Sequence, residues 1–306
     1  MEYTVERAYA KINLYLDVER KREDGYHDLF TVMQIVSLYD EVKITRTPSM
    51  GIKLTMNNCP MDIPMEENIA YRAAKKFYDN LSFEPTDGVD IVIDKRIPIA
   101  GGLGGGSADA AAVLRGLNNL YGKPYTRNEL CKIGATLGAD VPFSVVGGAQ
   151  FCRGVGDQMM DTLGIQYYNL LIACGDGKES TAEQYIKLDA KYNDFKNYEV
   201  DGDFHEMLTA FLSGRNREAF EKMYNVFESL YKGNETYAKI KRIMYENNAK
   251  IVMLSGSGPS VYGVFPNGLF AEDAQEALAK EGIASYTCNP INKEYEAIVP
   301  GKDPWN

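Results

Sequence analysis

The chain has 306 residues, of which 45% are hydrophobic and 25% are charged, and its formal net charge at pH 7 is −10. This length leaves room for two packed domains, and the composition is typical of a folded globular protein. The negative charge, which no basic stripe interrupts, argues against binding to nucleic acid or to an anionic membrane. Backbone amides and a few local cations can still bind a phosphorylated metabolite in one cleft. We therefore expect a small-molecule substrate and neither a nucleic-acid nor a membrane partner.

Cysteine and histidine usage restricts the chemistry further. The 5 cysteines are far apart, odd in number and form no Cys-x-x-Cys pair, so we interpret them as reduced thiols. Only His27 and His205 are available, which nearly excludes a histidine-rich metal site. The charged N-terminus lacks the apolar segment of a signal peptide, and no uncharged stretch approaches the roughly 20 residues of a membrane span. We expect a cytoplasmic protein.

The chain begins with the pattern of a sheet, followed by a helix and a glycine-rich loop. Two runs of alternating apolar residues flank the polar stretch 19–28, which predicts a mainly antiparallel sheet. Asn68 opens an amphipathic helix, and residues 89–95 form an alternating strand that leads into the glycine-rich loop.

Two helices are predicted after the loop. Ser107 can cap the first helix, which a glycine and a proline stop. Thr126 and Glu129 form a capping box for the second helix, which ends at Gly138. Asp140 follows directly after this helix end.

The pattern changes near residue 165 to strand, helix and loop, so we place the domain boundary between residues 1–165 and 166–306. The later part resembles a second layer of helices and strands, which makes the whole chain α+β. Its predicted elements are a buried strand at 169–174, a helix entered through Ser180 or Thr181, helices at 204–212 and 217–231, strands at 250–254 and 261–265, a helix that ends at Gly282, and a final strand.

The glycine-rich loop carries the strongest functional signal. Its glycines leave backbone N–H groups uncovered, and the helix that follows adds unpaired donors and the positive end of its dipole. The loop lacks the lysine of a P-loop and the spacing of a dinucleotide fingerprint, so it is a different phosphate-binding loop. We predict that it binds a nucleoside triphosphate. Its residues are Pro98, Ile99, Ala100, Gly101, Gly102, Leu103, Gly104, Gly105, Gly106 and Ser107.

These residues resemble the second signature of the GHMP kinase superfamily, which includes galactokinase and the homoserine and mevalonate kinases. Residues 254–260, Leu-Ser-Gly-Ser-Gly-Pro-Ser, resemble its third signature. The resemblance implies a two-domain GHMP kinase fold with a ribosomal protein S5 domain 2-like N-terminal domain and a ferredoxin-like C-terminal domain. It also places the active site in the cleft between the domains.

Within the superfamily the chain is most similar to a subgroup that acts on cytidine diphosphate methylerythritol. The motifs that carry this similarity extend over nearly the whole chain. The resemblance implies an ATP- and Mg²⁺-dependent phosphotransferase with an alcohol acceptor, the 2-hydroxyl, in the non-mevalonate route to isoprenoids and terpenoids. Gly105 and Gly106 stand where the superfamily usually has two serines, so the magnesium-side hydroxyl and the metal ligands stay open. The motifs are Ala-Lys-Ile-Asn-Leu at 10–14, Arg-Glu-Asp-Gly-Tyr-His at 22–27, Asp-Lys-Arg-Ile-Pro at 94–98 and Gly-Ala-Asp-Val-Pro at 138–142.

The resemblance makes Asp140 the catalytic aspartate and Lys11 the lysine that holds it. Phosphoryl transfer requires a positioned oxygen nucleophile, a group that accepts its proton, and cations that offset charge on the transferring oxygens. The predicted position of Asp140 past a helix C-terminus disfavours a carboxylate. A lysine within about 4 Å would offset this by roughly 4 kcal/mol before desolvation.

A second group of residues is expected to bind the cytosine ring. In the resembling subgroup a tyrosine stacks on the ring and a histidine hydrogen-bonds to its edge, and these positions match Tyr26 and His27. Tyr185 would face the ring from the other side. Met33 stands where a phenylalanine is expected, so this wall of the pocket is softer here. An aromatic–histidine pair in a polar loop is otherwise more often structural.

Four further residues have two readings each. Asn13 positions the substrate beside Lys11 or satisfies its own strand. Asn68 and Lys95 resemble adenine-side positions, or they are a helix cap and a solvated strand end. Thr181 contacts the diphosphate or caps its helix. In the third signature, small residues allow two backbone segments to approach closely. The same residues are also typical of a simple tight turn.

Two rival functions remain at this stage. One is another GHMP kinase, acting on mevalonate, homoserine or a sugar, although these substrates have no base for Tyr26 to stack on. The other is a ligand sensor without turnover, which has no need of both Lys11 and Asp140. A monomer and a homodimer are equally compatible with the sequence.

Overall fold

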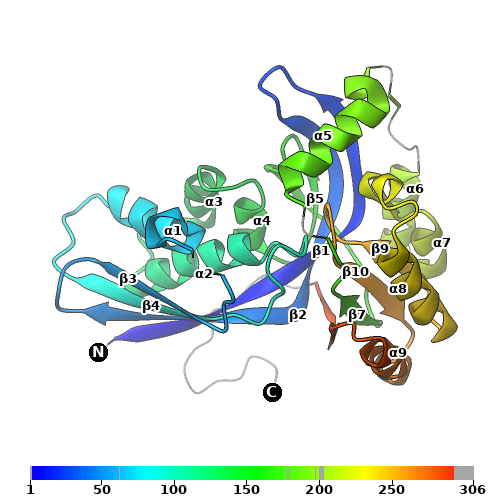
Figure 1. The fold of residues 1–306 in the computed structure, drawn as a ribbon. Helices are drawn as coiled ribbons and strands as arrows, with labels where there is room; N and C mark the ends of the chain where they lie inside the picture. Colours follow the sequence, from blue (N-terminus) through cyan, green and yellow to red (C-terminus); the bar gives the residue numbers. More distant parts are fainter. Residues whose placement is uncertain (1, 62, 178, 197, 200–202, 293–306) are drawn as a thin grey trace.

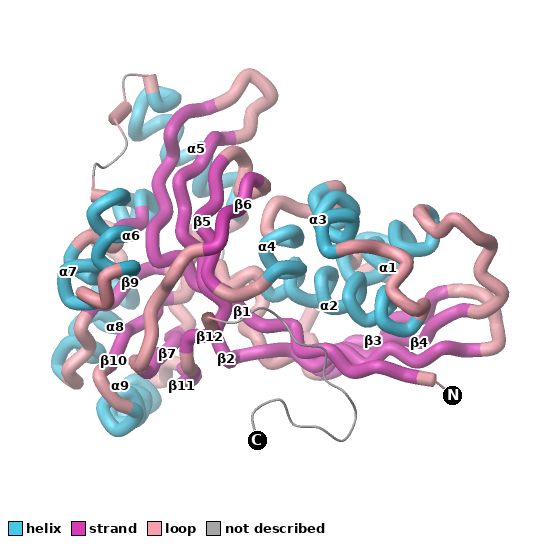
Figure 2. Tube along the Cα trace, turned by 180° about the vertical axis from the view of Figure 1, so that it is seen from behind, coloured by secondary structure: helices cyan, strands magenta, loops and turns pink. Residues whose placement is uncertain are grey.

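A long antiparallel hairpin organises the molecule. The computed structural model describes residues 2–61, 63–177, 179–196, 198–199 and 203–292. Strands β1 (Tyr3–Lys21) and β2 (His27–Thr47) pair along nearly their whole length, with the predicted polar stretch at the turn. In Figures 1 and 2 the hairpin first runs beneath α1 and α2 and then turns upward beside α5. It is therefore shared by both halves of the chain.

The pairing of β1 with β2 is irregular at three places, between Tyr9 and Lys11, Asn13 and Tyr15, and Val18 and Arg20. Such irregularities bend a strand and re-aim its side chains. At the first of them the backbone N–H of Lys11 donates to the carbonyl oxygen of Leu103, at 2.9 Å. The bend thus joins β1 to the glycine-rich loop.

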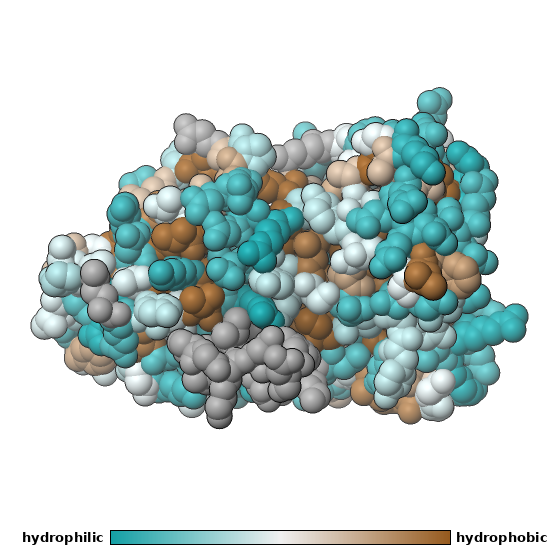
Figure 3. Space-filling model, turned by 90° about the horizontal axis from the view of Figure 1, so that it is seen from below, coloured by the Kyte–Doolittle hydropathy of each residue, from teal (hydrophilic) through white to brown (hydrophobic). Residues whose placement is uncertain are grey.

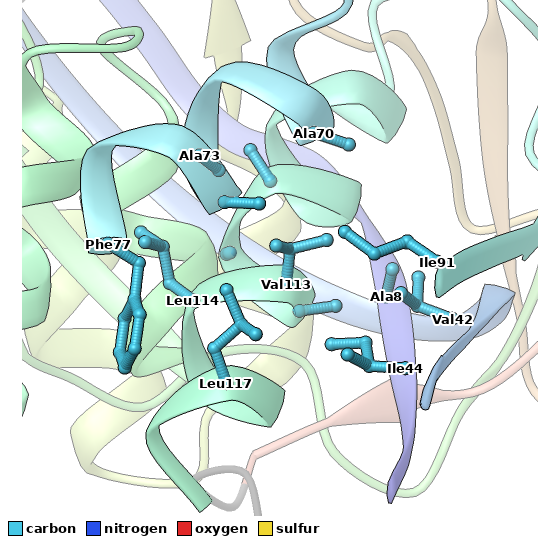
Figure 4. Close-up of a cluster of buried hydrophobic side chains, with 14 of the residues drawn as sticks. Ala8, Val42, Ile44, Ala70, Ala73, Phe77, Ile91, Val113, Leu114 and Leu117 are labelled. Atoms are coloured by element: carbon cyan, nitrogen blue, oxygen red, sulfur yellow. The ribbon is translucent and has the colours of Figure 1, made fainter. Parts of the chain in front are cut away.

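The larger sheet has the order β3-β4-β2-β1-β8, and β5, β6 and β12 pair on further edges. Helices α1 and α2 cover it and bury small and branched apolar side chains against β1, β2 and β4, as Figure 4 shows. Its strands beside the hairpin are β3 (Ile52–Asn57), β4 (Gly88–Asp94), β5 (Ala149–Arg153) and β6 (Gln158–Asp161), and its helices are η1 (Met65–Glu67), α1 (Ile69–Asp79), α2 (Gly105–Leu120), α3 (Arg127–Ala135) and α4 (Val141–Val146).

The smaller sheet is antiparallel throughout and has the order β11-β7-β10-β9. Taken along the chain this is strand order 4-1-3-2 with helices between the first two and the last two strands, which is the ferredoxin-like arrangement that we predicted. The elements are β7 (Asn169–Ala173), α5 (Thr181–Tyr192), η2 (Asn193–Phe195), α6 (Phe204–Leu212), α7 (Asn216–Glu221), η3 (Val226–Leu230), α8 (Glu235–Glu246), β9 (Ile251–Leu254), β10 (Val261–Phe265), α9 (Gly268–Lys280) and β11 (Ser285–Cys288).

Two short strands from the later part of the chain join the larger sheet. Strand β8 (Tyr224–Asn225) is parallel to β1, and β12 (Pro290–Ile291) is antiparallel to β2. The division that we predicted after residue 165 falls in the connection between β6 and β7. The two halves of the chain are therefore tied by strand pairing as well as by the hairpin.

Several local predictions are confirmed. The side chain of Asn68 caps α1 by accepting from the N–H of Ala70, at 2.9 Å. Thr126 and Glu129 form both hydrogen bonds of the predicted capping box at the start of α3. Strands 169–174, 250–254 and 261–265 are present to within one residue.

Two local predictions are wrong. Helix α2 begins at Gly105 and not at Ser107, because Gly104 takes the left-handed conformation (φ 70°) and starts the helix without a side-chain cap. The predicted helix 217–231 is broken after α7. There Asn225 turns inward and donates from Nδ2 to the carbonyl oxygens of Leu254 and Gly256, both at 2.9 Å, which a continuous helix would not permit.

The sequence analysis did not predict strands β3, β5 and β6, helices α4 and α8, or the two-residue strands β8 and β12. All 5 cysteines carry free thiols. No helix among the described residues is long and apolar enough to cross a membrane.

On the face drawn in Figure 3, hydrophilic side chains predominate and hydrophobic ones form small separate groups.

Candidate active site

One cavity of about 890 Å³ lies where the glycine-rich loop, the β1–β2 hairpin, α5 and the turn after β9 come together. Every residue that the sequence singled out as catalytic, cofactor-binding or substrate-binding lines it. Segments that are far apart in the sequence thus converge on one place.

The backbone of the glycine-rich loop has the conformation that its composition suggests. Ala100, Gly102 and Gly104 have positive φ values of 55°, 76° and 70°. A Cβ at Gly104 would lie 3.0 Å from Cγ of Lys11, so a side chain there would displace the lysine. The first residues of α2, from Gly105 to Ser107, have no intrahelical acceptor for their N–H groups and line the cavity. These donors make an anion site.

The turn after β9 packs directly against this loop. The hydroxyl of Ser255 donates to the carbonyl oxygen of Gly102, at 3.0 Å, and the N–H of Ser260 donates to that of Gly101, at 3.1 Å. A Cβ at Gly256 would lie 2.9 Å from the carbonyl oxygen of Gly102. The small residues are therefore needed for close contact between two backbone segments, and the predicted neighbourhood of the two signatures is confirmed.

Lys11 and Asp140 lie together at the cavity wall. Nζ of Lys11 is 3.6 Å from Oδ2 of Asp140, and the side chains are 8% and 36% exposed. The ammonium also donates to Oδ1 of Asn13, at 2.8 Å. That same oxygen accepts from the N–H of Gly256, at 3.0 Å, while Nδ2 of Asn13 donates to Thr31, at 2.9 Å. Asn13 thus fixes the lysine rather than merely satisfying its own strand.

The helix environment that we predicted for Asp140 is wrong. Helix α3 already ends at Ala135, and Asp140 directly precedes Val141, the first residue of α4. The backbone dipole at the start of a helix favours a carboxylate, whereas a helix end disfavours it. Asp140 therefore lies beside a helix start and a lysine, and not past a helix end.

The hairpin tip and α5 form the other end of the cavity. Tyr26 is 64% exposed, so its ring is free to contact a ligand. His27 is buried, with Nε2 2.7 Å from Oδ1 of Asp189. The ring of Tyr185 stacks on the imidazole, with centroids 4.5 Å apart and 18° between the planes. Tyr185 thus packs on His27, and its predicted contact with the base remains a prediction.

Thr181 and Met33, two other residues that the sequence analysis named, also lie at the cavity wall. Ser180, not Thr181, caps α5, through a capping box with Glu183. The hydroxyl of Thr181 is left to face the cavity and lies 3.3 Å from that of Ser257. Met33 is 2% exposed and packs among apolar residues at the cavity wall.

Lys95 is not the solvated strand end that we considered. It is buried, and its ammonium donates to the carboxylates of Asp40 and, at 2.7 Å, Asp109. Asp40 in turn accepts from the N–H of Ile97, at 2.8 Å, which fixes the entry to the glycine-rich loop. Burial lowers the pKa of Lys95, but the charges of Asp109 and Asp40 outweigh this and leave it above its ordinary value.

Asp40, Asp109 and Asp189 were missed by the sequence reasoning. Asp189 stands four residues after Tyr185, a spacing that puts both on one face of a helix, so this signal was available. Asp40 carried no comparable signal, since its partners lie far away in the sequence. Burial raises the pKa of Asp109, as does the charge of Asp40, against the lowering effect of Lys95.

Comparison with known proteins identifies both parts of the chain. The sequence model described as GHMP kinases N terminal domain matches residues 68–148, and that described as GHMP kinases C terminal matches residues 207–284. A mevalonate kinase structure from Methanococcus jannaschii has a TM-score of 0.73 at 20% identity, covering 95% of this chain and 98% of that one, and shows the same fold. The fold is that of a GHMP kinase.

Relatives with higher sequence identity show which family within the GHMP kinases the chain belongs to. The 4-diphosphocytidyl-2-C-methyl-D-erythritol kinase of Caldicellulosiruptor saccharolyticus is 40% identical over 92% of this chain and 96% of its own, and that of Clostridioides difficile is 37% identical over 97% and 98%. A crystal structure of 4-(cytidine 5′-diphospho)-2C-methyl-D-erythritol kinase matches with a TM-score of 0.73 and 29% identity, covering 94% and 99%. The chain belongs to the 4-diphosphocytidyl-2-C-methyl-D-erythritol kinase family.

Proposed function

We propose that this chain transfers the γ-phosphoryl group of ATP to the 2-hydroxyl of 4-diphosphocytidyl-2-C-methyl-D-erythritol, giving the 2-phosphate and ADP in the non-mevalonate route to isoprenoid precursors. The observation that carries the proposal is that one cavity holds a phosphate loop, an ammonium–carboxylate pair and an exposed aromatic ring. Residues 1–165 contribute the ATP side, and residues 166–306 complete the substrate side through α5.

Asp140 is the group that accepts the proton of the attacking hydroxyl. Its carboxylate is partly exposed at the cavity wall, so an alcohol can reach it. Lys11 holds this carboxylate and offsets negative charge on the transferring oxygens, as phosphoryl transfer requires. Asn13 keeps the ammonium in place through its 2.8 Å hydrogen bond. Positioning and charge stabilisation then supply most of the rate enhancement.

The N–H groups at the start of α2 bind the triphosphate, and Pro98 to Gly104 shape the loop that surrounds it. Asn68 and Lys95 lie on the adenine side of the same cavity. Because the ammonium of Lys95 is held by two carboxylates, it shapes this wall rather than reaching freely for the nucleotide.

Magnesium is the expected counterion of the triphosphate. The described residues include no group of three or more His, Cys, Asp or Glu side chains that could hold a metal. The cavity does offer the hydroxyl of Ser107 and the carboxylate of Asp140, and oxygen donors of this kind suit Mg²⁺, which keeps several waters and is held largely by substrate phosphates. Ser107 would hold the ion, which would neutralise phosphate charge, and Asp140 stays available as the proton acceptor.

Tyr26 and His27 bind the cytosine ring, and Thr181 contacts the diphosphate. The exposed ring of Tyr26 supports stacking, and the buried His27 lies beside it at the hairpin tip. Mevalonate, homoserine and galactose have no base, so they would leave this end of the cavity empty.

An ADP-release assay with the purified chain tests the proposal. The assay compares 4-diphosphocytidyl-2-C-methyl-D-erythritol with mevalonate, homoserine and galactose at equal ATP and Mg²⁺. Turnover is expected only with the first. Preferred turnover of any of the other three would refute the substrate assignment, and the absence of turnover with all four would refute the kinase assignment.

A further inference from the structure

We propose that Asp189 is a specificity-determining positioning residue that sets the tautomer of His27, so that the cavity selects a pyrimidine with an amino group over one with a carbonyl. The inference rests on the proposed function in one respect: the proposed function identifies the end of the cavity at the hairpin tip as the place where the base binds. Its physical basis is the hydrogen bonding of the two nitrogens of one imidazole ring.

The first step concerns Nε2 of His27. This nitrogen lies 2.7 Å from Oδ1 of Asp189. A carboxylate only accepts hydrogen bonds, so Nε2 carries the proton. In a neutral imidazole the other nitrogen, Nδ1, then has a free lone pair. Nδ1 has no hydrogen-bond partner among the described residues, and His27 lines the cavity.

The second step concerns what holds Asp189 and the ring. Oδ2 of Asp189 lies 2.8 Å from Nζ of Lys21, which compensates the carboxylate charge. Tyr185 stacks on one face of the imidazole, and Phe195 contacts it edge-on with centroids 5.8 Å apart. The ring can therefore neither turn over nor exchange its two nitrogens without breaking several contacts.

The consequence is a single acceptor presented to the base. The exocyclic amino group of cytosine donates to such an acceptor, whereas the carbonyl oxygen of uracil at the same place would set two lone pairs against each other. A buried polar group left without its partner costs roughly tenfold or more in affinity. Asp189 acts only through His27 and does not touch the reacting atoms.

The substitution Asp189→Asn gives a sharp test because of Lys21. The ammonium needs an acceptor, so it takes the amide oxygen and leaves the NH₂ group facing Nε2 of His27. Nε2 must then accept, and the ring proton moves to Nδ1. Asp194→Asn is the matched control, since Asp194 lies 2.8 Å from Nζ of the same lysine but has no hydrogen bond to His27.

The tautomer can be measured without activity, by long-range ¹H–¹⁵N correlation NMR on the full chain labelled at histidine, at about pH 8. The chain has 2 histidines, so the exposed His205 serves as the internal reference. We expect His27 in the Nε2–H form in the unmodified chain and in Asp194→Asn, and in the Nδ1–H form in Asp189→Asn. An Nδ1–H form in the unmodified chain would overturn the proposal.

The selectivity is measured by calorimetric titration of cytidine diphosphate and uridine diphosphate, with the glycine-rich loop saturated by a non-hydrolysable ATP analogue. Cytidine diphosphate should bind about tenfold more tightly or better to the unmodified chain and to Asp194→Asn, and Asp189→Asn should lose or reverse this preference. A preference unchanged in Asp189→Asn would refute the role of Asp189. Failure of the kinase assay alongside the expected NMR and titration results would instead refute the proposed function alone.

Discussion

The ammonium of Lys11 lies 3.6 Å from Oδ2 of Asp140, although one residue stands in β1 and the other directly before α4. The contact depends on a strand irregularity at Lys11 and on Asn13, which holds the ammonium from the other side. An ammonium and a carboxylate so placed beside a phosphate loop give the cavity the two charges that phosphoryl transfer uses.

The substitution Asp140→Asn should abolish most turnover and leave ATP binding nearly unchanged. The amide keeps the shape of the side chain but cannot accept the proton of the attacking hydroxyl, and loss of a general base lowers the rate roughly 100- to 10,000-fold. Steady-state ADP release and titration with an ATP analogue measure the two effects. The exposed Asp79→Asn serves as a control with unchanged turnover. Near-normal phosphorylation by Asp140→Asn would contradict the assignment.

The substitution Gly104→Ala should lower kcat as well as stability. Both Gly104 and Gly122 have positive φ, at 70° and 74°, so alanine at either position costs about 1 to 2 kcal/mol of backbone strain. Only at Gly104 would the new Cβ meet Lys11, whereas nothing lies within 4 Å at Gly122. Urea unfolding and kinetics of the two variants separate strain from displacement of the lysine. Equal kcat values in Gly104→Ala and Gly122→Ala would show that the lysine does not depend on this glycine.

The substitution Tyr26→Ala should raise KM for the cytidylyl substrate roughly 5- to 150-fold and change KM for ATP little, because stacking on a base contributes about 1 to 3 kcal/mol. Both constants are obtained from initial rates with the other substrate saturating. Tyr3→Ala, at an exposed position near the N-terminus, should change neither. Equal increases in both constants would argue against a stacking role.

The free energy of unfolding of the chain should depend on pH through the buried carboxyl of Asp109. Burial raises the pKa of this carboxyl, the charge of Lys95 lowers it and that of Asp40 raises it, and together they leave the pKa at about 7. The folded state then binds more protons than the unfolded state between the ordinary value of 3.8 and about 7. The contribution of this group to the free energy of unfolding therefore falls as the pH rises through that window.

Asp109→Asn removes this titration. Its free energy of unfolding, relative to the unmodified chain, should rise between about pH 4 and about pH 7, by at most about 1.4 kcal/mol per pH unit. Urea unfolding at several pH values measures the difference, with Asp79→Asn as the control for a titrating surface carboxyl. A difference that is independent of pH would show that Asp109 stays ionised throughout.

Local backbone features of this chain could be predicted because they depend on neighbours in the sequence. The glycine run predicted a loop of exposed backbone, the capping box at Thr126 predicted the start of α3, and the polar stretch 19–28 predicted the hairpin turn. Each rests on hydrogen bonds or φ preferences that a few consecutive residues decide. The motifs for Lys11 and Asp140 predicted their contact only through resemblance, since nothing local to either residue indicates its partner.

Only the tertiary structure decided which charges and rings meet. Lys95 looks like a surface residue in the sequence but is buried between Asp40 and Asp109, and Tyr185 packs on His27. These contacts depend on strand irregularities, on the pairing of distant segments and on the packing of α5 against the hairpin, where many weak interactions add up over long sequence separations. The sequence by itself therefore determined the backbone conformation of the glycine-rich loop, whereas the environment of each charged group was set by the packing of the two halves.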